Sequence, residues 1–185
     1  MSVKEESVEL WLVRHGETTS NAAGMISGWK DVHLSKKGRA MAEALRPILR
    51  HELFDRVVAS DLARAQDTAR LAHSEPAIEA RLRELDFGKL EGMNWETMPA
   101  DMQREILDFS EECAPGGELI SVFQARVFEY LASLPPGRHL LFVHGGVIRL
   151  VLRQVGADQF VPPTSVAVVN WSKRHLIELR LAPHA

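Results

Sequence analysis

Three apolar segments of the chain have the length and composition of buried strands, and each runs directly into ionisable side chains. The segments are Val8–Val13, Phe54–Ala59 and His139–Val143. The residues that follow them are Arg14-His15-Gly16, Ser60 through Arg64, and His144-Gly145-Gly146. Helical patterns separate the three segments, which is typical of a parallel sheet covered by helices on both faces. Because ligands bind at the carboxyl ends of such strands, we expect these polar groups to lie together at one edge.

The remaining periodicity extends the α/β pattern over the whole chain. Helices are expected over residues 35–49, 62–72, 95–112, 118–133 and 147–155, and further strands near 78 and over 166–171 and 176–181. Pro47 should kink or shorten the first helix, and Ser60 or Asp61 can cap the second. The short closing strands could make the sheet mixed. We predict one domain over 1–185, a three-layer α/β/α sandwich with a mostly parallel central sheet and a short helical cap inserted at about 93–114.

Composition argues against several classes of function. The 185 residues carry a net charge of −3, without the basic excess that nucleic-acid binding needs. No apolar run approaches the ~18 residues of a membrane-spanning helix, and the N-terminus lacks the apolar core of a signal peptide. The single cysteine, Cys113, rules out an intrachain disulfide, and the histidines lack metal-ligand spacing. We therefore expect a cytoplasmic protein with no nucleic-acid or membrane partner, no metal and no cofactor.

The predicted edge of the sheet is cationic in a chain that is acidic overall. It gathers two arginines and two histidines, which are Arg14, Arg64, His15 and His144. Clustered arginines are costly to bury without an anion, and their planar forks match phosphate oxygens. Gly145 and Gly146 stand where a strand meets a helix, so free backbone N–H groups there also favour an anion. These residues predict a phosphate site.

Two histidines beside a phosphate suggest covalent catalysis. A nitrogen of a neutral imidazole can attack phosphorus and form a phosphohistidine. Two arginines and a second histidine would stabilise the charge on the phosphoryl oxygens. The leaving alkoxide needs a proton, and Glu84, in the segment 82–88, is our candidate for the acid.

Four ordered motifs contain the residues of this predicted site. The first runs from Leu12 to Thr18 and continues through Asn21, Gly28-Trp29 and Gly38, and the second contains Ser60, Arg64 and Thr68. The third contains Glu84, Phe87-Gly88 and Glu91-Gly92, and the last is Val143–Arg149. Together they resemble the histidine phosphatase superfamily, in its phosphoglycerate mutase-like branch, over nearly the whole chain. Short members of this kind resemble α-ribazole phosphatases, broad phosphomonoesterases, and phosphatases of sugar or glycerate phosphates.

The resemblance implies metal-independent phosphoryl transfer from a small organic phosphate. By it, His15 is the nucleophile that becomes phosphorylated. Glu84 is the proton donor and later the base that activates water. Three side chains hold the phosphoryl oxygens, namely Arg14, Arg64 and His144.

The resemblance also implies several further contacts. Asn21 and the Gly145 amide add contacts to the phosphate, and Ser27 lies at the substrate side. Leu119 stands where a serine is common in the family, at a position without a chemical role. We interpret Glu91 as structural.

The segment at about 93–114 bears on what receives the phosphoryl group. Phosphoglycerate mutases that resemble this chain carry a longer cap there. The segment has six acidic residues against one arginine, which makes it a poor partner for a second phosphate plus a carboxylate. Its apolar residues could line a pocket for an organic leaving group, or form the cap's own buried face. We expect a phosphomonoesterase, with a cofactor-dependent phosphoglycerate mutase as the alternative and a non-catalytic phospho-ligand binder as a third hypothesis.

Overall fold

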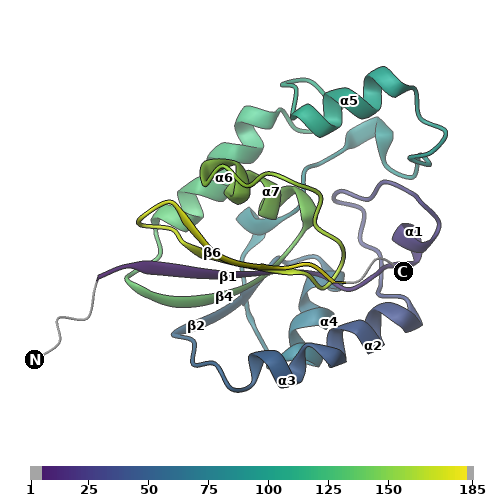
Figure 1. Cartoon of the computed structure of the whole chain (residues 1–185). Helices are drawn as coiled ribbons and strands as arrows, with labels where there is room; N and C mark the ends of the chain where they lie inside the picture. The colour runs from purple at the N-terminus through teal and green to yellow at the C-terminus, as the bar shows by residue number, and fades with distance from the viewer. Residues whose placement is uncertain (1–5, 183–185) are drawn as a thin grey trace, which may run out of the picture.

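The computed structural model describes residues 6–182, and its centre is one six-stranded sheet (Figure 1). The strand order is β3-β2-β4-β1-β5-β6. In chain order the strands are β1 Val8–Arg14, β2 Arg56–Ala59, β3 Ala77–Ile78, β4 Gly137–Val143, β5 Val166–Asn170 and β6 His175–Arg180. The first four pair in parallel, whereas β5 and β6 are antiparallel to their neighbours. The α/β class and the mostly parallel sheet are confirmed, and the closing strands make the sheet mixed.

Helices cover both faces of the sheet, which gives three layers (Figure 1). One face carries α2 Lys36–Ala44, α3 Arg46–Leu49 and α4 Ala63–Ala72, and the other carries α6 Ile120–Ala132 and α7 Gly145–Gln154. Successive residues of a strand point to opposite faces. In β1, Leu10 and Leu12 therefore join the core that includes α6 and α7, and Trp11 and Val13 join the core that includes α4. Burial on both faces explains why the central strands are continuous apolar runs.

The break expected in the first long helix is present. Ser35 caps α2, because its hydroxyl accepts a hydrogen bond from the backbone N–H of Gly38 at 2.9 Å. Helix α2 ends at Ala44, and Pro47 stands in the first turn of α3, where its missing N–H costs nothing.

The prediction that Ser60 or Asp61 caps the next helix is wrong. Leu62, not Ser60 or Asp61, occupies the N-cap position of α4, and it makes no capping side-chain hydrogen bond. Asp31 supplies the acceptor from a distant part of the chain, since its Oδ1 accepts from the backbone N–H of Ala63 at 2.9 Å. A cap donated by tertiary contact leaves no local pattern in the sequence.

The cap segment lies at the top right of Figure 1, on the same side of the sheet as α6. Its helix α5, Ala100–Asp108, is shorter than the expected 95–112. Residues before Pro99 pair instead with the loop after α1, Thr19–Ala22: Trp95 N donates to Gly24 O at 2.8 Å. Two 3-10 helices, Ala80–Leu82 and Gly88–Leu90, complete the fold. Over residues 6–182, no helix is long and apolar enough to cross a membrane.

Candidate active site

Two histidines meet where β1 and β4 end. His15 follows β1 and His144 follows β4, and the two strands pair in parallel with Arg14 opposite Val143. The backbone N–H of His15 donates to Val143 O at 3.0 Å. The ring centroids of the two histidines lie 5.2 Å apart, and both side chains are buried. Strand pairing therefore joins two motifs that are far apart in the sequence.

The His15 ring is held in one tautomer. Its Nδ1 lies 2.7 Å from the carbonyl oxygen of Gly16. A carbonyl oxygen only accepts, so Nδ1 carries the hydrogen and Nε2 keeps its lone pair. Burial lowers the pKa of His15 well below its usual value, and the positive charges of Arg64 and Arg14 lower it further. The ring is therefore neutral at neutral pH, and Nε2 can act as a nucleophile.

The two arginines of this cluster are held by backbone carbonyls. Arg14 Nη1 donates to Val161 O, while Arg64 donates from Nη2 to Gly28 O at 2.7 Å and from Nη1 to Lys30 O at 3.2 Å. Burial lowers the pKa of Arg14 to about 10 and also lowers the pKa of Arg64. Both guanidinium groups stay charged at neutral pH. Neutral carbonyl acceptors thus fix the orientation of two positively charged guanidinium groups.

Several buried nitrogens of the cluster make no hydrogen bond within residues 6–182. They are Nε of Arg14, Nε of Arg64 and both ring nitrogens of His144. Buried polar groups normally have partners, so unpaired ones gathered in one place point to a ligand site. Burial, with the nearby charge of Arg64, lowers the pKa of His144 well below its usual value. The donor set is one that suits phosphoryl oxygens.

Glu84 borders the same cluster. Its Oε2 accepts from the backbone N–H of Gly146 at 3.0 Å, and Oε1 accepts from Leu85 N at 2.9 Å. A Cβ on Gly146 would lie 2.2 Å from Oε1, so the carboxylate has room only beside a glycine. The negative charge of Glu84 opposes the effect of burial on the pKa of Arg14 and Arg64. The carboxylate therefore lies within electrostatic reach of both guanidinium groups.

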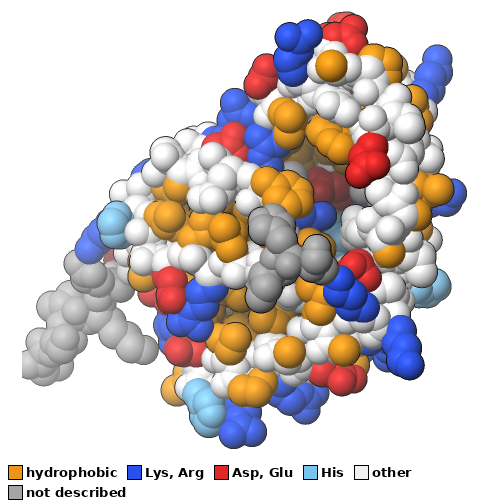
Figure 2. Space-filling model, turned by 45° about the vertical axis from the view of Figure 1, so that its right-hand side comes forward, with side chains coloured by type: hydrophobic (Ala, Val, Ile, Leu, Met, Phe, Trp, Pro, Cys, Tyr) orange, Lys and Arg blue, Asp and Glu red, His pale blue; other side chains and the backbone are white. Residues whose placement is uncertain are grey.

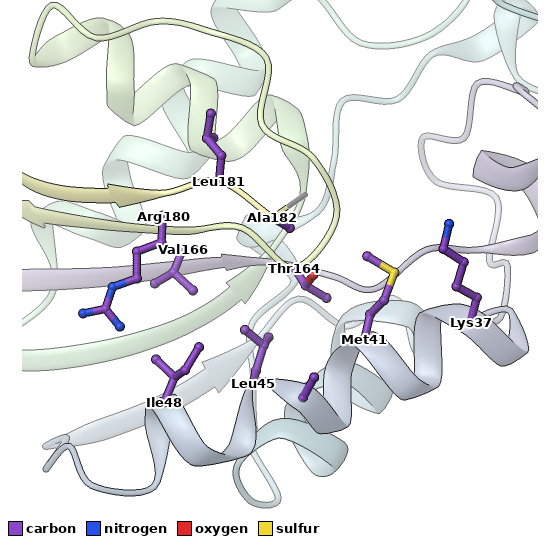
Figure 3. Close-up of a pocket in the computed structure, with 10 residues that line it drawn as sticks. Lys37, Met41, Leu45, Ile48, Thr164, Val166, Arg180, Leu181 and Ala182 are labelled. Atoms are coloured by element: carbon purple, nitrogen blue, oxygen red, sulfur yellow. The ribbon is translucent and has the colours of Figure 1, made fainter. Parts of the chain in front are cut away.

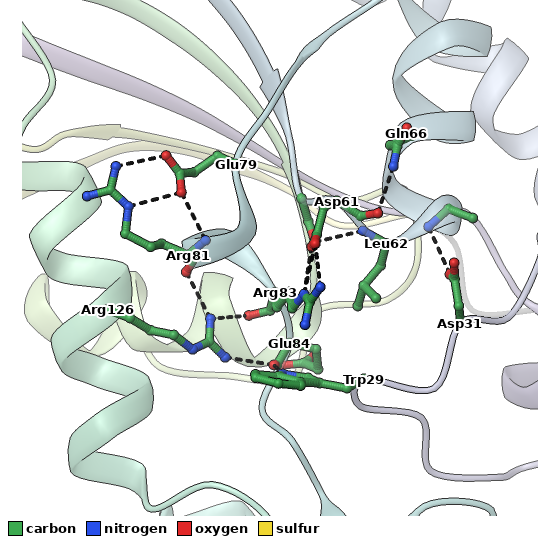
Figure 4. A network of polar contacts seen from close by, with 12 residues as sticks. Trp29, Asp31, Asp61, Leu62, Gln66, Glu79, Arg81, Arg83, Glu84 and Arg126 are labelled. Atoms are coloured by element: carbon green, nitrogen blue, oxygen red, sulfur yellow. Dashed lines mark hydrogen bonds and ion pairs between the residues drawn. The ribbon is translucent and has the colours of Figure 1, made fainter.

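Arg126 anchors the backbone around Glu84 (Figure 4). Its Nη1 donates to the carbonyls of Arg81 at 2.8 Å and Arg83 at 2.7 Å, and its Nη2 donates to the carbonyl of Glu84 at 2.8 Å. The Glu118 carboxylate accepts from Nε at 2.7 Å and from Nη2 at 2.8 Å. These bonds match the five N–H groups of a guanidinium, so the donor capacity of Arg126 is fully used.

Trp29 supports the same carbonyl. Its indole N–H donates to Glu84 O at 2.8 Å, and the Arg83 guanidinium stacks with its Cζ 4.7 Å from the ring centroid. Arg83 itself pairs with Asp61 and not with Glu84. Sequence reasoning assigned no role to Arg126 or Trp29. A signal for Arg126 exists, because it is the only basic residue of α6 and lies among buried apolar positions.

A turn held by Glu91 positions Arg64. The Glu91 carboxylate accepts from the backbone N–H groups of Trp29 at 2.7 Å and Lys30 at 2.8 Å. The carbonyls of Gly28 and Lys30, in the same turn, are the ones that hold the Arg64 guanidinium. The hydrogen bonds of Glu91 are therefore structural: they hold the turn whose carbonyl oxygens orient the Arg64 guanidinium.

The other expected site residues differ in how they relate to the cluster. Gly145 begins α7, and a Cβ there would lie 3.4 Å from Cζ of Arg14, so its backbone borders that guanidinium. Asn21 Oδ1 accepts from Thr18 N at 3.1 Å in the capping box of α1. Ser27 is half-buried in the loop that follows. Among the described residues, no hydrogen bond joins Asn21 or Ser27 to the cluster, and their contacts with phosphate and substrate stay predictions.

The surface is hollowed on one face, and acidic, basic and histidine side chains are visible in the hollow (Figure 2). A separate cavity of about 480 Å³ lies between α2, α3 and the ends of β5 and β6, with Met41, Leu45 and Ile48 on one wall (Figure 3). The residues that line it do not include the histidines or Glu84. In the described part of the chain, no group of three or more His, Cys, Asp or Glu side chains is placed to hold a metal ion.

The fold and the cluster define the class of this protein, and comparison with known proteins agrees. A model of the histidine phosphatase superfamily (branch 1) matches residues 10–181. The chain belongs to this superfamily, and it is an enzyme of the phosphatase or mutase type. The resemblance seen in the four motifs is thereby confirmed.

Proteins named as phosphatases and proteins named as phosphoglycerate mutases are both similar to the chain. An adenosylcobalamin/α-ribazole phosphatase from Salmonella typhimurium is 34% identical, covering 80% of this chain and 79% of the relative. A probable phosphoglycerate mutase from Enterobacter sp. (strain 638) is 35% identical, covering 75% and 70%. The crystal structure of a phosphoglycerate mutase from Thermus thermophilus is 43% identical with a TM-score of 0.86, covering 95% of this chain and 99% of that one.

Proposed function

We propose that this protein is a phosphomonoesterase that hydrolyses a small organic phosphate through a phosphohistidine on His15, without a bound metal. The observation that carries the proposal is a set of buried nitrogens beside the His15 ring that make no hydrogen bond within residues 6–182, namely those of Arg14, Arg64 and His144. Guanidinium and imidazole N–H groups in that number suit the oxygens of one phosphoryl group. The phosphatase name of one relative agrees with this reaction.

In the first half of the proposed reaction, His15 Nε2 attacks phosphorus while the bond from phosphorus to the alcohol oxygen breaks. Arg14, Arg64 and His144 stabilise the charge on the other phosphoryl oxygens. Glu84, as a carboxylic acid, donates its proton to the leaving oxygen, so the alcohol departs neutral. The Gly16 carbonyl keeps the hydrogen on Nδ1, which leaves Nε2 as the reacting atom.

In the second half, water attacks the phosphorus of the phosphohistidine. The Glu84 carboxylate accepts a proton from this water, which restores the carboxylic acid. The bond between phosphorus and nitrogen breaks, and its electron pair returns to His15 Nε2. Inorganic phosphate is the second product.

Trapping the intermediate tests the proposal. The protein is mixed with a radiolabelled phosphomonoester and quenched in alkali, which preserves phosphohistidine. We expect label on the wild type and on the control His33→Ala, whose exposed side chain lies outside the cluster, but none on His15→Ala. Turnover of p-nitrophenyl phosphate should survive excess chelator. Turnover by His15→Ala at the wild-type rate, or complete loss on chelation, would count against the proposal.

A phosphoglycerate mutase is the second candidate, since relatives of similar identity carry that name. A mutase returns the phosphoryl group to a glycerate instead of to water. It predicts interconversion of 2- and 3-phosphoglycerate faster than their hydrolysis, with a bisphosphoglycerate primer required. The acidic cap segment favours the phosphatase, because it repels a polyanionic substrate. Tight phosphate or vanadate binding without any turnover would instead support a non-catalytic binder.

A further inference from the structure

The segment between α7 and β5 is fastened to the rest of the fold at two points. At the first, the Asp158 carboxylate accepts from Arg149 Nε of α7 at 2.9 Å. At the second, the carbonyl of Val161 accepts from Arg14 Nη1. Phe160 lies between these two points and next to the second one. The segment therefore holds an aromatic side chain beside the phosphate cluster.

Phe160 stacks on one of the two guanidinium groups of that cluster. Arg14 Cζ lies 5.5 Å from the centroid of the Phe160 ring, and the side chain of Phe160 is 61% exposed. The buried Nε of Arg14 makes no hydrogen bond within residues 6–182, and the proposed function places a phosphoryl oxygen there. Such an oxygen lies about 3 Å from the nitrogen that holds it. The bound ester and the ring would thus be neighbours on the same guanidinium.

The other exposed aromatic side chain has a structural role. Over residues 6–182, the exposed aromatic residues are Phe160 and Trp29, which is 39% exposed. The Trp29 indole N–H donates to Glu84 O at 2.8 Å, and Arg83 stacks on its ring. Phe160 has no polar atom in its side chain, and more than half of it is open to solvent. Apolar surface at the edge of a polar ligand site is suited to the organic part of a ligand.

The direction of the proposed reaction brings the organic group toward this surface. The attacking ring of His15 is buried. Attack in line requires the leaving oxygen to lie on the opposite side of phosphorus from Nε2. The alcohol that carries this oxygen therefore extends away from the buried imidazole, toward the solvent-exposed rim of the site. Phe160 belongs to that rim, because it is exposed and contacts a phosphate-binding guanidinium.

We propose that Phe160 is a specificity-determining residue, whose ring contacts the organic group of the substrate and favours alcohols with a flat apolar surface. This inference rests on the proposed function and deepens it. Apolar surface that the ester buries against the ring stabilises the complex, and contact between two aromatic rings adds to this. The effect acts on the organic group and leaves the phosphoryl group as it is.

A matched pair of substrates tests the inference. Benzyl phosphate and ethyl phosphate both release an alcohol that needs a proton, so they differ in the aromatic ring and share the chemistry. We expect kcat/KM, measured by release of inorganic phosphate, to be at least about tenfold higher for benzyl phosphate. A ratio of one or below, with p-nitrophenyl phosphate hydrolysed through His15, would overturn the inference and leave the phosphatase standing. Absence of hydrolysis for all three esters would overturn both.

Two variants assign the preference to the ring. Phe160→Ala should lower the ratio of benzyl to ethyl phosphate about fivefold or more, and Phe160→Tyr, which keeps an aromatic ring, should preserve it. Removing a side chain this exposed costs little stability, so both variants should fold. The control Leu53→Ala removes an 84% exposed apolar side chain from the loop before β2, at the opposite end of that strand from Ser60, and should leave the ratio unchanged. An unchanged ratio in Phe160→Ala would overturn the inference.

Inhibition by inorganic phosphate separates contact with the substrate from positioning of Arg14. Phosphate has no organic group, and the carbonyl of Val161 holds the Arg14 guanidinium whether or not the ring is present. The inhibition constant of phosphate should therefore stay within about threefold in Phe160→Ala. If phosphate inhibition and turnover of both esters instead weakened by the same factor, the ring would only position the guanidinium, and its role in specificity would be refuted.

Discussion

Replacing Arg126 by lysine should uncouple the proposed acid from its scaffold. The guanidinium makes five hydrogen bonds. Three go to the carbonyls of Arg81, Arg83 and Glu84 (Figure 4), and two go to the Glu118 carboxylate. Lysine keeps the positive charge but has only three donors on one nitrogen. At least two of the five bonds must therefore be lost.

The expected loss of stability follows from that count. Each hydrogen bond lost from a partly buried carbonyl or carboxylate costs about 1 kcal/mol or somewhat more, so Arg126→Lys should lower the free energy of unfolding by about 2–3 kcal/mol. In a domain of this size, about 2–4 °C in Tm corresponds to each kcal/mol. Thermal unfolding should therefore shift down by about 4–12 °C.

The effect on catalysis should depend on the leaving group. A mispositioned Glu84 donates its proton poorly, and general acid catalysis is worth about 10²–10⁴-fold. For an alkyl phosphate such as glycerol 2-phosphate, kcat should therefore fall about 10²-fold, with little change in KM. p-Nitrophenolate leaves as a stable anion without needing a proton, so its ester should be much less affected. Glu84→Gln gives the reference pattern for complete loss of the acid.

A stability control separates positioning from general damage. Arg138 also donates several hydrogen bonds, to Glu9, Glu52 and the Leu53 carbonyl, but lies at the opposite ends of the strands. Arg138→Lys should lower Tm and leave the rate ratio of alkyl to aryl phosphate at the wild-type value. Equal rate losses on both esters in Arg126→Lys would refute the positioning role.

Three further expectations concern the cluster itself. Arg64→Lys keeps the charge but cannot hold two carbonyls and still reach the phosphoryl group, so kcat should fall about 10²–10³-fold in steady-state assays; a near-wild-type kcat would mean that charge alone suffices. The lowered pKa values of His15 and His144 mean that both rings stay neutral as the pH falls through 6.5, and NMR titration of the imidazole nitrogens should show no protonation there. Gly146→Ala places a methyl group 2.2 Å from the Glu84 carboxylate, so that the carboxylate must move. The kcat for an alkyl phosphate should then fall, even at temperatures well below the Tm of the variant, where the protein is fully folded. An unchanged kcat for the alkyl phosphate would contradict that contact.

Much of the fold follows from local sequence. The apolar runs of β1 and β4, the hydroxyl cap of Ser35 and the break at Pro47 all act over a few residues, so their outcomes could be predicted. The cap of α4 and the short α5 could not, because Asp31 and Gly24 reach them from distant parts of the chain.

The cluster was partly predictable for a related reason. His15 and His144 each follow a strand, and parallel pairing makes neighbouring strand ends meet. The groups that hold the cluster from outside are different. Arg126 and Trp29 act through backbone carbonyls, which have no sequence signature, and Glu118 acts by holding the Arg126 guanidinium. Recognising such roles requires the positions of the acceptors.

The choice of partner separates two roles for arginine in this molecule. Arg83, Arg126 and Arg149 each form an ion pair with a carboxylate, so their positive charge is offset locally and their role is structural. Arg14 and Arg64 are directed by carbonyl oxygens, with Glu84 as the nearby anion, and they retain charge that burial makes costly. Strand pairing and the two apolar cores must offset that cost. A phosphoryl dianion supplies the counter-charge, which makes binding more favourable. These interactions strengthen as the phosphoryl oxygens gain charge in the transition state, so they also lower the barrier to transfer.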